Sequence, residues 1–109
     1  MTDPSKIRYA KIQESLEPCV TELNIKNKTV KVDWHIPIEF CHTKGTIAHG
    51  GTVSFILDAS MFFVVDLIHK GFTTGLTLGL NIQYLNPCRP GQLTTEASIL
   101  REGKNFAFT

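Results

Sequence analysis

The sequence lacks most of the features that mark a specialised class of protein. Its three cysteines are widely spaced and form no Cys-x-x-Cys pair, so neither a disulfide framework nor a four-ligand zinc site is predicted. Eleven Lys and Arg residues balance ten Asp and Glu residues to a net charge of +1. This balance argues against a nucleic-acid partner or an anionic membrane surface as a partner.

Long apolar runs are also missing. The N-terminus is polar and charged and lacks the apolar core of a secretory signal. The longest apolar stretch, residues 55–68, is interrupted by Asp58 and Asp66 and is shorter than the ~20 residues that span a bilayer. With 109 residues, 42% of them hydrophobic, the chain is expected to be one soluble, cytoplasmic domain over residues 1–109. A core of this size is thin, so oligomerisation would help it.

Strand and helix patterns alternate along the first half of the chain. Residues 5–16 are weakly amphipathic and predict a short helix. Leu23 and Ile25 alternate with polar neighbours, residues 26–28 indicate a turn, and residues 30–36 hold period two up to Pro37, which predicts a hairpin. Residues 37–52 lose this period and predict an ordered loop.

The next segment, residues 52–70, carries apolar side chains on nearly every side and predicts a helix of about 18 residues. Such a helix is expected to be wrapped by other elements. Residues 76–85 show the cleanest alternation in the chain and predict a strand, and residues 92–100 and 104–109 predict further strands. Together these elements predict an α+β fold in which one central helix lies in a curled antiparallel sheet.

His49, Gly50 and Gly51 stand where this helix begins. The first N–H groups of a helix have no internal partners and lie at the positive end of its dipole, so they can polarise a carbonyl oxygen. Glycine removes the Cβ that would hold a ligand away. The alternative is that the two glycines are only a flexible entry to the helix.

Asp58 is a carboxylate in the middle of this apolar helix. An ionised, unpaired carboxylate is costly there, so Asp58 either has a functional role or pairs with a loop or a lysine. Gly51 and Asp58 are seven residues apart, or roughly 10 Å along the axis, whereas a base acts at about 3 Å. If both serve one substrate, two chains must meet antiparallel and each site must take Asp58 from the partner. His42 and His49 lack a third ligand at a convincing spacing, so no metal is expected.

Several short motifs occur in one order. They are residues 45–51, Asp58, residues 81–87, Pro90-Gly91 and residues 100–104. In this combination the chain resembles the hotdog-fold acyl-CoA thioesterases of the phenylacetate-pathway (PaaI-like) and thioesterase-superfamily-member-two type, over residues 34–109.

The resemblance implies roles for individual residues. It places the thioester carbonyl at a backbone amide near Gly50 in the His49-Gly50-Gly51 motif. It makes Asp58 the nucleophile or general base and Thr77 the residue that positions water. Four further residues are expected to contact substrate, namely His42, Thr43, Gly51 and Asn81. No cofactor is implied, and the site is built across a homodimer or a dimer of dimers.

The chain departs from the family pattern in two respects. Thr43 stands where members usually have asparagine, with His42 beside it, so the network that holds the carbonyl or water differs. Hotdog domains also usually continue for ~25 to 30 residues beyond this point, so we expect a domain that lacks its final strands. The leading hypothesis is hydrolysis of an acyl-CoA thioester to free acid and CoA. The alternative is a non-catalytic protein that binds an acyl group or acyl-CoA on the same scaffold.

Overall fold

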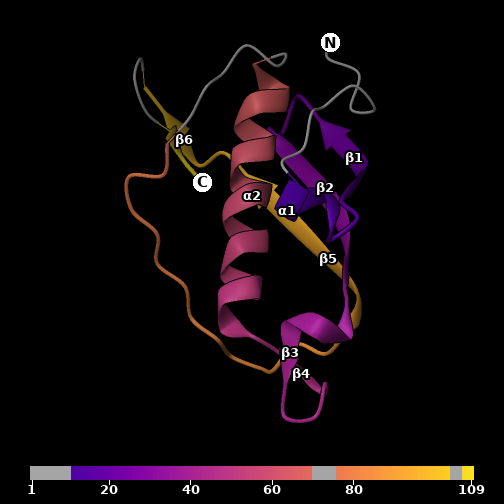
Figure 1. Ribbon diagram of the computed structural model, residues 1–109. Helices are drawn as coiled ribbons and strands as arrows, with labels where there is room; N and C mark the ends of the chain where they lie inside the picture. The colour runs from indigo at the N-terminus through magenta and orange to yellow at the C-terminus, as the bar shows by residue number, and fades with distance from the viewer. Residues whose placement is uncertain (1–10, 70–75, 104–106) are drawn as a thin grey trace.

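The computed structural model describes residues 11–69, 76–103 and 107–109 (Figure 1). Its elements are helices α1 (Lys11–Glu14) and α2 (Gly50–Ile68), a 3-10 turn at Ile38–Phe40, and strands β1 (Cys19–Asn24), β2 (Thr29–Ile36), β3 (Cys41–His42), β4 (Ile47–Ala48), β5 (Gly91–Ser98), β6 (Arg101–Glu102) and β7 (Ala107–Phe108). The predicted α+β architecture, a central helix on an antiparallel sheet, is confirmed. Of the helix predicted over residues 5–16, the structure has α1, and residues 5–10 lie outside the described residues.

The main sheet has three strands in the order β1-β2-β5, all antiparallel. The predicted hairpin is confirmed as β1 and β2, and β5 pairs with β2 from Thr29↔Ser98 to Ile36↔Gly91. The even-numbered residues of β2 are buried while their neighbours are more exposed. These buried side chains form one face of the core and are Val30, Val32, Trp34 and Ile36. The period-two pattern therefore placed the apolar face of β2 correctly.

Helix α2 packs against this apolar face of the sheet (Figure 1). It begins at Gly50, two residues before the predicted start. Its buried side faces β2 and β5, and consists of Val53, Ile56, Ala59, Ser60, Phe63, Val64 and Leu67. Phe63 stacks on Trp34 with ring centroids 5.8 Å apart. Beneath the helix, Thr95 Oγ1 accepts from Trp34 Nε1 at 3.0 Å and contacts Ser60 Oγ at 2.7 Å, so the polar atoms of this core are satisfied.

The opposite side of α2 is less covered than the sequence predicted. Side chains such as Phe55, Phe62 and Val65 are half-buried, because within the described residues the sheet covers one side of the helix. By length and composition α2 could cross a membrane, a property that core helices of soluble proteins share. In this structure it lies on the sheet.

The strand predicted over residues 76–85 is wrong for this structure. The segment pairs with no other strand in the described part of the chain, and Figure 1 shows it running back beside α2 rather than in the sheet. Its leucines are exposed, with Leu76 at 89% and Leu78 at 86%. The later predictions hold better: residues 92–100 form most of β5, and β6 and β7 pair as a short hairpin.

Residues 37–49, predicted as an ordered loop, contain the small hairpin β3–β4. Its turn is left-handed over three consecutive residues, with φ of 54° at Thr43, 57° at Lys44 and 77° at Gly45. Glycine is required at position 45, because an added Cβ would lie 2.7 Å from Ile38 Cγ2. The hairpin ends at His49, where α2 begins, so it holds the start of the helix in place.

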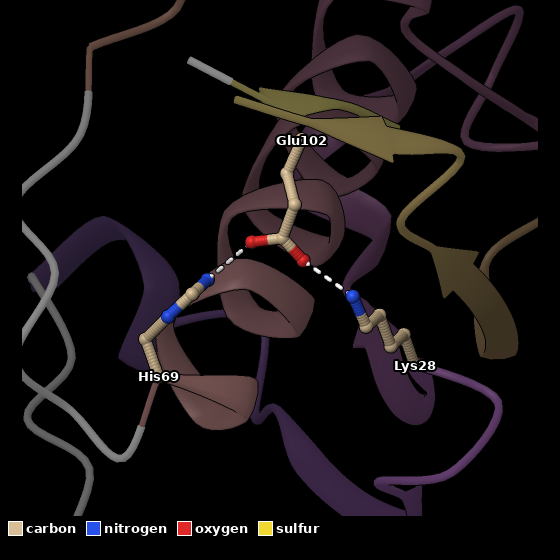
Figure 2. A network of polar contacts seen from close by, with 3 residues as sticks. All are labelled: Lys28, His69 and Glu102. Carbon is tan, nitrogen blue, oxygen red and sulfur yellow. Dashed lines mark hydrogen bonds and ion pairs between the residues drawn. The ribbon is translucent and has the colours of Figure 1, made fainter. Parts of the chain in front are cut away.

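A polar network joins three distant parts of the chain at the other end of the fold (Figure 2). The Glu102 carboxylate contacts Lys28 Nζ at 2.8 Å and His69 Nε2 at 2.7 Å. Lys28 belongs to the β1–β2 turn and His69 follows α2, so Glu102 links both to β6. The hydrogen bonds from Lys28 and His69 lower the pKa of the Glu102 carboxyl.

Candidate active site

The start of α2 presents backbone N–H groups that are not used within the helix. His49 is the N-cap residue, and its carbonyl oxygen accepts from Thr52 N at 3.0 Å and from Val53 N at 3.2 Å. No group among the described residues accepts from the N–H of Gly50 or Gly51. These two amides can therefore donate to a carbonyl oxygen or to the oxyanion that forms from it.

The two glycines have different surroundings. A Cβ on Gly50 would lie 3.6 Å from the Tyr84 ring and hydroxyl, an ordinary contact, whereas a Cβ on Gly51 would meet nothing within 4 Å. An alanine therefore fits the fold at either position. Any functional need for glycine here comes from the approach of a ligand and not from crowding inside the chain.

Tyr84 is a site residue that the sequence analysis did not single out. Its hydroxyl donates to the Gly50 carbonyl oxygen at 3.0 Å and also contacts Ser54 Oγ, which bonds the same oxygen at 2.9 Å. The signal was present in the motif of residues 81–87, but nothing in that motif indicates which element the tyrosine contacts. Tyr84 thus ties the segment after α2 back to the first turn of the helix.

Asp58 and Thr77, which the sequence analysis placed in one site, lie together. Thr77 Oγ1 donates to Asp58 Oδ1 at 2.6 Å. Asp58 is half-buried and stands on the same face of α2 as Gly51, two turns earlier. The alternative that Asp58 pairs with a lysine finds no such contact among the described residues. Asp58 keeps one oxygen for which no hydrogen bond is recorded in this part of the chain.

His42, Thr43 and His49 lie on or beside the β3–β4 hairpin. The rings of His42 and His49 are 5.0 Å apart between centroids, and His42 Nδ1 contacts Thr43 Oγ1 at 2.8 Å. All three side chains are exposed, close to the start of α2. Among the described residues, no three His, Cys, Asp or Glu side chains group as a metal site.

Asn81 is the one predicted site residue that the structure does not bring to the others. It is exposed and makes no recorded hydrogen bond within the described chain. It lies between the two points, Thr77 and Tyr84, at which its segment is tied to α2.

Two open pockets flank the start of α2. One, of about 260 Å³, lies on the Gly50 side and is lined in part by Tyr84, Asn86 and Cys88. The other, of about 180 Å³, lies on the Gly51 side and is lined by Leu16, Phe40, Gly51, Thr52 and Phe55. The first offers polar groups along its wall, whereas the second is almost wholly apolar.

The model of the thioesterase superfamily matches residues 45–109, more than half of the chain. The chain belongs to this superfamily. Within the thioesterase match lie His49, Gly50, Gly51, Asp58, Thr77 and Asn81, while His42 and Thr43 precede it. No curated protein matches the chain significantly.

Two solved structures share the fold of this thioesterase-superfamily chain. A proposed thioesterase from Ralstonia eutropha JMP134, a phenylacetic acid degradation-related protein, matches with a TM-score of 0.84 and 20% identity, over 94% of this chain and 76% of that one. A conserved protein from Pseudomonas aeruginosa matches with a TM-score of 0.74 and 19% identity, over 88% of this chain and 74% of that one. The hotdog fold that the resemblance implied is confirmed, and family membership supports thioester hydrolysis as the general activity.

Proposed function

We propose that the protein hydrolyses acyl-CoA thioesters to a free acid and CoA. The observation that carries this proposal is the arrangement on α2: unused N–H groups at Gly50 and Gly51, and the hydrogen-bonded Asp58–Thr77 pair on the same face of the helix. A thioester hydrolase needs a donor for the carbonyl oxygen and a carboxylate that attacks or activates water. The helix supplies both in a chain of the thioesterase superfamily.

In the proposed reaction the thioester oxygen accepts from the helix amides. Asp58 either attacks the carbonyl carbon or removes a proton from an attacking water, and the C–S bond breaks to release the thiol. Thr77 holds the reactive carboxylate and its water. His42, His49 and Thr43 border the same amides and would contact the substrate near its carbonyl.

The two pockets favour one orientation of the substrate. A pantetheine arm carries amides that need hydrogen-bond partners, and the pocket beside Tyr84 and Asn86 offers them. An acyl group needs apolar walls, and Leu16, Phe40 and Phe55 provide these on the Gly51 side. The thioester would then lie across the start of α2.

We further propose that the active unit is a homodimer or a dimer of dimers. Roughly 10 Å of helix separates Gly51 from Asp58, so one chain's carboxylate does not reach a carbonyl at its own helix start. An antiparallel partner would bring its Asp58 to that carbonyl. The exposed leucines of residues 76–85 are the surface that such a partner would cover.

Asp58→Asn tests the chemistry directly. The change keeps the volume and removes the basicity, so thiol release from acyl-CoA esters should fall by about 10²-fold or more while the protein stays folded. Asp66→Asn, on the same helix, is the matched control and should keep its rate. Equal rates for wild type and Asp58→Asn would exclude a catalytic Asp58.

Mixing two inactive variants tests the shared site. Gly50→Val places a branched side chain in the path of the thioester oxygen and should inactivate its own site. After dimer exchange with Asp58→Asn chains, each mixed dimer regains one intact site and about half of the wild-type rate by site counting. Verified exchange without recovery would show that both residues serve one chain.

The same assays separate hydrolysis from the alternative, binding without turnover. A binding protein would retain acyl-CoA in equilibrium dialysis and release no thiol. Thr43, in place of asparagine, is the observation that favours this alternative, because its hydroxyl is already engaged with His42.

A further inference from the structure

The Gly50 carbonyl oxygen is contacted by two side-chain hydroxyls. Ser54 Oγ lies 2.9 Å from it and Tyr84 Oη lies 3.0 Å from it. A serine that bonds the carbonyl four residues earlier is common in helices. A second hydroxyl on the same oxygen, from a segment 30 residues further along the chain than Ser54, is a specific tertiary feature.

The two hydroxyls also contact each other, so two protons serve three contacts. Each hydroxyl carries one proton. If one hydroxyl donates to the other, the second still donates to Gly50. In every such arrangement the Gly50 oxygen therefore receives at least one side-chain hydrogen bond.

This oxygen belongs to the same planar peptide unit as the Gly51 N–H. In a trans peptide the two groups point in opposite directions, so a bond that holds the oxygen also sets where the N–H points. A hydrogen bond to the oxygen draws electron density from the nitrogen and makes its N–H a stronger donor. The Gly51 N–H is one of the two unused amides at the start of α2.

We infer that Ser54 and Tyr84 are positioning residues, which orient and polarise the Gly51 N–H so that it donates to the thioester oxygen in the transition state. This inference rests on the proposed thioester hydrolysis. It assigns a role to Tyr84 beyond that of a pocket wall, and it names Gly51 as an oxyanion donor beside Gly50.

Tyr84→Phe and Ser54→Ala, singly and together, test the inference by kinetics. The phenylalanine keeps the ring beside Gly50 and removes only the hydroxyl. Each single variant should lower kcat by about threefold to tenfold, below the ~10²-fold loss for a removed oxyanion donor, and leave KM within about twofold. The double variant should lose more than either single one. Tyr84→Leu, which removes the pocket wall as well, should raise KM.

A spectroscopic readout makes the test independent of turnover. In protein labelled at glycine with ¹³C and ¹⁵N, the Gly50 carbonyl and Gly51 amide resonances should move upfield in the double variant, and those of Gly79 should not. Unmoved Gly50 and Gly51 resonances, or moved resonances with an unchanged kcat, would overturn the inference. Absence of thiol release by the wild-type protein would instead count against the proposed function.

Discussion

Strand β2 and residues 76–85 have equally regular alternation of apolar and polar side chains, yet they differ completely in structure. Strand β2 is flanked by β1 and β5 and covered by α2, and its apolar side chains are buried. Residues 76–85 run outside the sheet, attached to α2 at Thr77 and Tyr84, with Leu76 and Leu78 exposed.

The difference shows that alternation specifies which face of a strand is apolar and not whether the strand has a partner. A strand forms only where another strand can satisfy its N–H and C=O groups. Strand β2 finds both partners within the described chain. Residues 76–85 keep the pattern of a strand and expose it, as a surface that pairs with a further strand would.

Trp34→Ala is the strongest way to break the well-packed half of this comparison. The indole is 1% exposed, stacks on Phe63 and donates to Thr95, so its loss should lower the free energy of unfolding by about 3–5 kcal/mol in urea denaturation. Leu78→Ala in the exposed segment should change it by less than about 0.5 kcal/mol when the protein is dilute. Similar losses for the two variants would contradict the packing described here.

Thr95→Val tests the hydroxyl cluster beneath the helix. Valine keeps the shape of the side chain but leaves the Trp34 N–H without its acceptor and removes a contact of Ser60. The free energy of unfolding should fall by about 1–3 kcal/mol. Thr94→Val is the control: Thr94 is exposed and bonds Asp33, so a loss as large as that of Thr95→Val would be unexpected.

Hydrogen exchange sharpens the comparison without any substitution. Backbone amides of β2 and β5 should be strongly protected, while those of residues 76–85 should exchange almost freely in dilute protein, because no strand of the described chain pairs with them. If the proposed dimer pairs this segment, alternate amides should gain protection as protein concentration rises. Full protection at high dilution would mean that the segment is paired within one chain.

The smallest effect is expected at Glu102, whose contacts lie near the surface. Its folded-state pKa is lowered by Lys28 and His69, so its contribution to stability is present above the ordinary carboxyl pKa and is lost as pH falls through the lower value. The stability difference between wild type and Glu102→Gln should therefore shrink below about pH 4.5. Glu22→Gln, which removes a longer 3.6 Å pair with Lys31, serves as the control. A difference that stays constant from about pH 6 to about pH 3 would contradict the network.

The site divides along the same line as the fold. His49, Gly50, Gly51 and Asp58 could be predicted because they follow one helix, where sequence spacing is also spatial spacing. The meeting of Thr77 with Asp58 could be proposed only through family resemblance. The contact of Tyr84 with Gly50 and Ser54 gave no local signal, since it joins residues 34 and 30 positions apart.

The sequence by itself determined the local properties of this protein: the hairpin, the long apolar helix, the glycines at its start and the carboxylate in its middle. These follow from period, propensity and capping, which act over a few residues. Only the tertiary structure decided that β5 and not residues 76–85 lies beside β2, that one side of α2 is covered, and that two hydroxyls converge on the Gly50 carbonyl. Those outcomes depend on which distant groups satisfy one another's hydrogen bonds and apolar surface, and such pairings have no period along the chain.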